Sequence, residues 1–268
     1  MAKLEVKTGY SRNGLPYACI GSGPRNLVIF DGLDFAHKPP SGLMLRMTAS
    51  MFKHLANDFT VYMVRRKPDL PADYSMQDMS NDYATMVRDE LGGPADIMGI
   101  STGGPIAQYF AADHPDLVRH LVLASTGYRL SDYGSQQQRR LISLAEEGKW
   151  RATAAVMASL ISSGITRLVY ASMFWLLGKY FFGSPATPSD GIVELKAEDR
   201  HDFKERLVEI KAPTLVIGGE KDPLYLMRET AAGIPNARLI LYEKTGHMAI
   251  RKSQFSKDVL AFLTEETT

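Results

Sequence analysis

Apolar and polar positions along this chain alternate between two periodicities, one typical of buried strands and the other of helices. Short runs of consecutive apolar residues predict strands, and the stretches between them repeat apolar residues every three or four positions, which predicts helices. In the helix expected at residues 76–91, Met79, Tyr83, Met86 and Val87 share one side. This alternation predicts an α/β fold, a mostly parallel central sheet with helices on both faces.

The expected elements fall into two groups that are separated along the chain. In the first group, strands are expected at residues 15–20, 27–30, 59–64, 95–100 and 117–125, and helices at 42–57, 76–91 and 102–113. In the second group, strands are expected at 212–219 and 237–242, and helices at 226–232 and 253–265. Because the same rhythm resumes after the gap, both groups are expected to form one sheet.

Between the two groups, residues 128–208 lack the strand rhythm and carry helix-forming and apolar stretches, which predict helices at 136–160 and 165–182. We therefore expect a core domain of residues 1–127 and 209–268, with 128–208 inserted as a helical cap. The apolar run 168–182 contains Lys179 and is shorter than the roughly 20 residues of a membrane span. It is interpreted as a cap helix that covers the active site, and attachment to a membrane surface is the alternative.

The apolar side chains of the cap suggest a pocket for a short or medium acyl chain or an aromatic group. The same side chains could equally form the core of the cap itself. The candidate pocket residues are Met157, Met173, Phe174, Trp175, Tyr180 and Phe181.

Composition narrows the class of partner. The 268 residues include 31 basic and 30 acidic side chains, and the resulting net charge of +1 gives no electrostatic basis for binding nucleic acid. A small-molecule partner is therefore expected. The single cysteine, Cys19, cannot form an internal disulfide, and the first residues contain no apolar core of signal-peptide length. A cytoplasmic protein is the expectation, and whether it is a monomer or a homo-oligomer stays open.

The candidate nucleophile is Ser101, in the sequence Gly99-Ile100-Ser101-Thr102-Gly103. This G-x-S-x-G motif follows an expected strand and precedes an expected helix, so the serine lies at the tip of a sharp turn. A serine hydroxyl needs exposure, a nearby base and backbone donors to act as a nucleophile, and such a turn can provide all three. A phosphate-binding P-loop is the competing interpretation, but it requires a Gly-Lys-Ser/Thr sequence that is missing here.

Two later segments supply the other groups that a nucleophilic serine needs. A histidine must accept its proton, and a carboxylate must orient that histidine. Asp222 follows the strand expected at 212–219, and His247 follows the strand expected at 237–242. Since the carboxyl ends of parallel strands meet at one edge of a sheet, we expect both side chains to lie beside Ser101.

With these residues in the order serine, acid, histidine, the sequence resembles the α/β-hydrolase superfamily. The resemblance extends to residues 112–123, which are typical of the bridge from the elbow helix to the next strand, and it leaves only the insertion unmatched. It implies an α/β-hydrolase fold with an inserted helical cap. The family's Gly-x-x-Asp spacing selects Asp222 over Glu220, and Asp132 is a more remote candidate.

The same resemblance implies an oxyanion hole made by the backbone N–H groups of Leu33 and Thr102. The family usually has a His-Gly pair before the first of these donors, whereas this chain has Asp31-Gly32. Because the donor belongs to the main chain, it does not depend on that side chain. An ionised Asp31 close to the hole would weaken stabilisation of the oxyanion, and a solvated or hydrogen-bonded Asp31 would not.

The resemblance therefore implies a serine hydrolase that cleaves carboxylic esters through an acyl-enzyme on Ser101, without a metal or organic cofactor. Other enzymes reachable from the same triad are a thioesterase or acyltransferase, a lactonase, a carbon–carbon bond hydrolase and a hydroxynitrile lyase. A ligand-binding protein on the same fold, without turnover, is the alternative from another class. The remaining histidines, scattered without metal-ligand spacing, are His37, His54, His114, His120 and His201.

Overall fold

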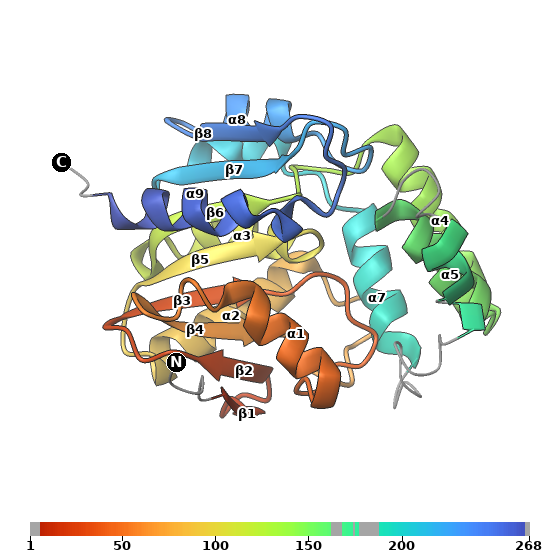
Figure 1. Cartoon of the computed structure of the whole chain (residues 1–268), viewed down its shortest axis with the longest axis horizontal. Helices are drawn as coiled ribbons and strands as arrows, with labels where there is room; N and C mark the ends of the chain where they lie inside the picture. Colours follow the sequence, from red (N-terminus) through yellow and green to blue (C-terminus); the bar gives the residue numbers. More distant parts are fainter. Residues whose placement is uncertain (1–5, 162–167, 174, 177–187, 266–268) are drawn as a thin grey trace.

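The protein is built around one twisted sheet, whose strands run across Figure 1 and are stacked from β1 at the bottom to β8 at the top. The computed structural model describes residues 6–161, 168–173, 175–176 and 188–265. The strands lie in the order β1-β2-β4-β3-β5-β6-β7-β8. Their bounds are β1 Val6–Tyr10, β2 Pro16–Ile20, β3 Arg25–Phe30, β4 Phe59–Val64, β5 Ala95–Ile100, β6 Val118–Ala124, β7 Thr214–Gly219 and β8 Arg238–Tyr242.

Most neighbouring strands are parallel, which confirms the predicted α/β class. Strand β2 pairs antiparallel with both β1 and β4, and every pairing from β4 through β3 to β8 is parallel. The register aligns the carboxyl ends of the parallel strands: Phe30 pairs with Gly99, Ile100 with Ala124, and Gly219 with Tyr242. Loops that leave these ends are therefore brought to one edge of the sheet.

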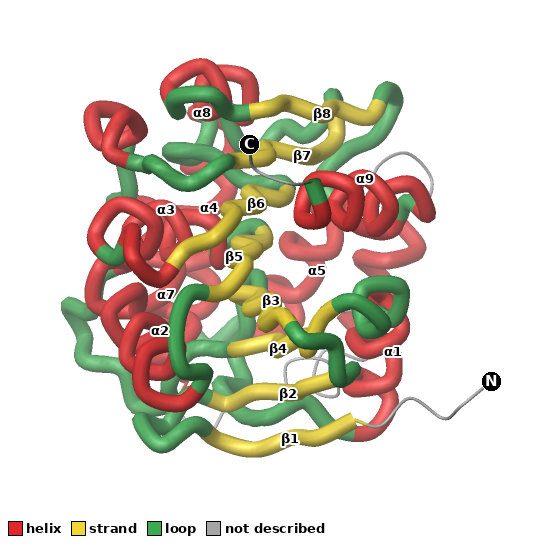
Figure 2. The backbone as a smooth tube through the Cα atoms, turned by 90° about the vertical axis from the view of Figure 1, so that its left-hand side faces the viewer, coloured by secondary structure: helices red, strands yellow, loops and turns green. Residues whose placement is uncertain are grey.

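Helices cover both faces of the sheet (Figure 2). Helices α1 (Gly42–Phe52) and α9 (Ser253–Thr264) lie on one face, and α2 (Met76–Glu90), α3 (Gly103–Asp113) and α8 (Met227–Gly233) lie on the other. Short 3₁₀ helices occupy Pro115–Leu117, Lys204–Glu209 and Ala249–Arg251.

Alternate residues of a strand point to opposite faces, so each strand contributes to two apolar cores. In β3, for example, Val28 and Phe30 pack toward α2 and α3, whereas Leu27 and Ile29 pack toward α1 and α9. All four side chains are fully buried. Burial on both faces explains why these strands are continuous apolar runs in the sequence.

Between β6 and β7 the chain forms helices α4 (Asp132–Glu146), α5 (Trp150–Ile161) and α7 (Pro188–Asp199). They lie together beyond the carboxyl ends of the parallel strands (Figure 1). Leu141, Val156 and Leu195, one from each helix, form a small core with Phe35. That residues 128–208 constitute a separate cap domain stays a prediction.

Three elements differ from the sequence expectations. The edge strand β1 was not expected, because it buries too few side chains to show a strand pattern. The helix expected at 136–160 is two helices, since Gly148 has a left-handed φ of +68° between them. Helix α7 escaped prediction because Glu194 and Glu198, two of its buried residues, are charged. The helix expected at 165–182 falls largely outside the described residues.

Among the residues described, no helix is both long enough and apolar enough to cross a bilayer.

Candidate active site

Ser101 occupies a tight turn between β5 and α3. Its φ of +50° lies in the left-handed region, which a residue with a side chain adopts only where the surroundings enforce it. Two backbone hydrogen bonds hold the turn: Ser101 N–H donates to the Ala124 carbonyl at 3.0 Å, and Gly104 N–H donates to the Ser101 carbonyl at 2.8 Å. The turn therefore fixes the position of the serine side chain at the end of the sheet.

The glycines of the motif allow this turn to pack against its neighbours. A Cβ on Gly103 would lie 2.1 Å from the Phe30 carbonyl oxygen, and one on Gly99 would lie 2.7 Å from the Ala107 Cβ. Both distances are shorter than any real Cβ contact, so a larger residue would push β3 or α3 away. Close approach of the backbones, rather than a positive φ, is the reason for glycine at these two positions.

The loops after β7 and β8 bring Asp222 and His247 to Ser101. His247 Nε2 lies 3.0 Å from Ser101 Oγ, and His247 Nδ1 lies 2.8 Å from Asp222 Oδ2. A carboxylate can only accept hydrogen bonds, so Nδ1 carries the proton and Nε2 is left to accept the proton of the serine hydroxyl. The Leu224 N–H, which donates to Asp222 Oδ1 at 2.9 Å, orients the carboxylate.

The two competing carboxylates lie elsewhere. Glu220 forms an exposed ion pair with Arg228 at 3.3 Å, and Asp132 has a fully exposed side chain beside Arg129. Of the three candidates, the structure therefore brings only Asp222 to the histidine.

The cavity next to Ser101 is small and mixed in character. Its volume is about 70 Å³, and residues from the core and from α4, α5 and α7 line it. Its walls are mainly apolar, with Leu141 and Met157 among them, while Gln138, Glu198 and Tyr225 supply polar groups. Walls of this kind suit an apolar group with few polar atoms.

Leu33 and Thr102, the expected oxyanion-hole residues, line this same cavity. Among the described residues, no protein group accepts a hydrogen bond from the backbone N–H of either one. Thr102 directly precedes the first turn of α3, where the helix dipole favours negative charge. Neither N–H is engaged by another described residue, as the expected role in an oxyanion hole requires.

A buried carboxyl group, that of Glu198 in α7, lines the same cavity as Ser101. It accepts hydrogen bonds from Thr102 Oγ1 at 3.1 Å, from Gln138 Nε2 at 2.6 Å and from the Tyr225 hydroxyl. Burial raises the pKa of Glu198 above its ordinary value, although these three donors oppose the shift. Burial and the adjacent Glu198 raise the pKa of Tyr225 well above its ordinary value, so Tyr225 stays a neutral phenol, 5.9 Å from the His247 ring.

Of the six predicted pocket residues, Met157 lines the cavity. Met173 is not among the lining residues, and Trp175 is 48 % exposed, with the Arg151 guanidinium 5.1 Å from its ring centre. Trp175 is therefore not among the described residues that line this cavity, and its pocket role stays a prediction. Nothing is described for Phe174, Tyr180 and Phe181, which lie outside the described residues.

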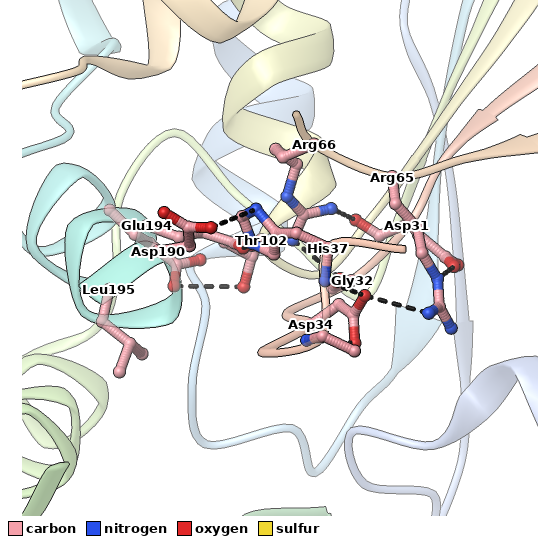
Figure 3. Close-up of polar contacts among 12 residues, drawn as sticks. Asp31, Gly32, Asp34, His37, Arg65, Arg66, Thr102, Asp190, Glu194 and Leu195 are labelled. Atoms are coloured by element: carbon pink, nitrogen blue, oxygen red, sulfur yellow. Dashed lines mark hydrogen bonds and ion pairs between the residues drawn. The ribbon is translucent and has the colours of Figure 1, made fainter. Parts of the chain in front are cut away.

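Asp31, in the loop after β3, is held by an arginine (Figure 3). Arg65 Nε lies 3.4 Å from Asp31 Oδ2, and Arg65 NH1 lies 3.0 Å from Asp34 Oδ2. Burial raises the pKa of Asp31, and the positive charges of Arg65 and Arg66 oppose that rise. The sequence left open whether Asp31 is ionised close to the hole or is solvated or hydrogen-bonded. In the structure its carboxyl group accepts a hydrogen bond from Arg65.

Sequence reasoning missed several residues of the site. Glu198 and Gln138 lie in the insertion, where no motif marks them, and Tyr225 lies three positions after Asp222, close enough to have been considered. Within the described part of the chain, no group of three or more histidine, cysteine or acidic side chains could hold a metal ion.

Comparisons with known proteins identify the family to which this fold belongs. The chain belongs to the α/β-hydrolase fold family, whose model matches residues 49–251. Among curated relatives, the pimeloyl-[acyl-carrier protein] methyl ester esterase of Nitrosomonas europaea is 26 % identical over 196 residues, covering 67 % of this chain and 76 % of that protein. The family resemblance inferred from the sequence is thereby confirmed.

Solved structures show the same fold. A hydrolase from Pseudomonas aeruginosa PA01 superposes with a TM-score of 0.77 at 21 % identity, covering 97 % of this chain and 98 % of that one. The enol-lactonase of Burkholderia xenovorans LB400 superposes with a TM-score of 0.77 at 20 % identity, covering 97 % of this chain and all of that one (100 %). At these identities the likeness concerns the fold alone.

Proposed function

We propose that this protein is a serine hydrolase that cleaves carboxylic esters of small acyl groups through an acyl-enzyme on Ser101. The observation that carries the proposal is the continuous contact from Ser101 through His247 to Asp222, at 3.0 Å and 2.8 Å, at the edge of a small cavity. The relative named as a methyl ester esterase supports the same class of reaction.

In the first half of the reaction, Ser101 Oγ attacks the ester carbonyl carbon while its proton passes to His247 Nε2. The carbonyl oxygen becomes an oxyanion, and the backbone N–H groups of Leu33 and Thr102 donate hydrogen bonds to it. His247 then gives the proton to the leaving alkoxide oxygen. The carbon–oxygen bond breaks, the alcohol departs and an acyl-serine remains.

In the second half, water repeats the attack. His247 takes a proton from the water, whose oxygen adds to the acyl carbon, and the same two N–H groups hold the second oxyanion. The proton returns to Ser101 Oγ as the carboxylic acid is released. Asp222 keeps the imidazole in one tautomer and stabilises its protonated form through both halves.

The decisive variant is Ser101→Ala, which removes the nucleophile and little else. We expect hydrolysis of p-nitrophenyl butyrate to fall by about 10³-fold or more, because the oxyanion hole alone leaves only weak catalysis. Initial rates measured by p-nitrophenolate release give the result, with circular dichroism to show that the fold is intact.

Labelling identifies the reacting atom independently. A fluorophosphonate should add to Ser101 in the wild-type protein, as located by mass spectrometry of the digested chain. Wild-type rates in Ser101→Ala would contradict the proposal. Absence of an adduct on Ser101 would favour a ligand-binding protein without turnover.

A further inference from the structure

We propose that Arg66 is a positioning residue that fixes the Leu33 donor of the oxyanion hole, and that Glu194 of helix α7 holds Arg66 in place. This inference rests on the proposed function. It concerns a side chain that does not line the cavity and touches neither Ser101 nor His247, so it would act only through the backbone of the loop after β3.

Arg66 binds the carbonyl oxygens of two successive residues in that loop. Its NH1 donates to the Asp31 carbonyl at 2.5 Å, and its NH2 donates to the Gly32 carbonyl at 2.8 Å. The guanidinium is planar and presents its donors as a rigid fork, so two simultaneous bonds define the orientation of both peptide groups.

The Gly32 carbonyl and the Leu33 N–H belong to one peptide group. The described chain has no cis peptide bond, and in a planar trans peptide the C=O and N–H point in opposite directions. When Arg66 binds the carbonyl from one side, the Leu33 N–H must therefore point to the other side. Gly32 itself lies against the nucleophile, since a Cβ placed on it would be 3.6 Å from Ser101 Cβ.

The position of Arg66 is itself fixed by the insertion. Arg66 is only 1 % exposed and forms an ion pair with Glu194, which is fully buried in α7 (Figure 3). His37 Nε2 lies 3.3 Å from the other oxygen of Glu194, and His37 Nδ1 donates to the Lys67 carbonyl at 2.7 Å. A charged group on α7 is thereby connected, through one arginine, to the backbone of the oxyanion hole.

The neighbouring Arg65 makes comparable polar contacts but does not bind the Gly32–Leu33 peptide. Arg65 binds the side chains of Asp31 and Asp34 and the Lys38 carbonyl, none of which belongs to the Gly32–Leu33 peptide. Arg66 is thus distinguished from Arg65 by its bond to the Gly32 carbonyl.

Two variants test the proposal. Arg66→Lys keeps a positive charge beside Glu194, but a single ammonium group cannot hold both carbonyls in a fork. The double variant Arg66→Met/Glu194→Gln removes both charges, so that neither is left buried without a partner. We expect kcat for p-nitrophenyl butyrate to fall at least about tenfold in both variants, with KM changed less than about threefold, because the lost interaction acts on the oxyanion of the transition state.

The matched control lies at the opposite end of β3, the strand that leads into the Gly32–Leu33 loop. Arg25, the first residue of β3, pairs with buried Asp96 at 2.7 Å and donates to the Leu263 carbonyl at 2.8 Å, far from the site. Arg25→Lys should lower the melting temperature without changing kcat. Inhibition by an alkylboronic acid, which forms a tetrahedral adduct on serine, should weaken in the Arg66 variants in parallel with kcat and stay unchanged in Arg25→Lys.

A crystal structure of Arg66→Lys gives a readout that needs no activity. Rotation of the Gly32–Leu33 peptide, or loss of its order, supports the proposal. An unchanged peptide, or a kcat within twofold of wild type in a folded Arg66 variant, overturns it. If the wild-type protein itself cleaves no ester and takes no fluorophosphonate, the proposed function fails, and the orientation of this peptide still decides the role of Arg66.

Discussion

At the scale of single residues, the site depends on short contacts between groups that are far apart in the chain. Asp222 and His247 are 25 positions apart, and Ser101 and His247 are 146 apart, yet their side chains touch. Asp222 has a fully buried side chain, so its negative charge is screened little by solvent and acts directly on His247. We therefore expect charge at position 222 to matter far more than charge two positions earlier.

Substitution of this carboxylate tests that expectation. In Asp222→Asn, the amide can donate to His247 Nδ1, which places the imidazole proton on Nε2 and prevents it from accepting the serine proton. We expect kcat for p-nitrophenyl butyrate to fall by about 10²–10⁴-fold. Glu220→Gln is the control: it lies on the same loop, pairs only with exposed Arg228, and should leave kcat unchanged. Equal losses in the two variants would contradict the assignment of Asp222.

At the scale of elements, helices α4 and α5 determine how much room the nucleophile faces. Leu141 of α4 and Met157 of α5 both line the cavity beside Ser101, and Leu141 also packs in the small core around Phe35. The apolar walls that these helices contribute favour an acyl chain. The helices of the insertion, rather than the sheet, are therefore expected to set acyl preference.

Shortening one wall residue should change that preference. Met157→Ala removes most of a flexible side chain from the cavity wall, so esters with longer acyl chains gain space. We expect the ratio of kcat/KM for p-nitrophenyl hexanoate to that for the acetate to rise by about threefold or more. Met47→Ala, on the exposed side of α1, is the matched control and should leave the ratio unchanged. If the ratio is the same in both variants, Met157 of α5 does not affect the preference for acyl-chain length.

At the scale of the whole molecule, the connection between insertion and core carries a titratable group that responds to acid. His201, just after α7, is 6 % exposed and packs between Tyr109 and Phe203, with ring centres 5.7 Å and 5.9 Å away. Within the described residues, neither of its ring nitrogens has a hydrogen-bond partner. Burial without a partner penalises the charged form and lowers the pKa of His201 to about 3.

This shift makes folding stability depend on pH. Between the ordinary pKa of 6.5 and about 3, the unfolded chain binds a proton at this position that the folded protein does not. The free energy of unfolding should therefore decrease as the pH is lowered through this window, by up to about 1.4 kcal/mol per pH unit from this group. His201→Phe should make the fall shallower in urea titrations from pH 7 to pH 4. His54→Gln, at an exposed position, should leave the slope as it is.

The fold and the proximity of Ser101, Asp222 and His247 were accessible from the sequence because each rests on a local signal. Apolar runs predict the parallel strands, the spacing around Ser101 predicts the turn, and the positions of Asp222 and His247 just after two strands predict where they emerge. Parallel strands all end at the same edge of the sheet, so local order in the chain becomes proximity in space.

What only the tertiary structure decided is the environment of those residues. Arg66, Glu194 and Glu198 are charged side chains that are buried, and a sequence pattern assigns such residues to the surface. Their burial is compensated by partners from distant segments: the carbonyls of the loop after β3 for Arg66, and the hydroxyls of Thr102 and Tyr225 for Glu198. Such compensation has no period or spacing along the chain, because it depends on which elements meet in space.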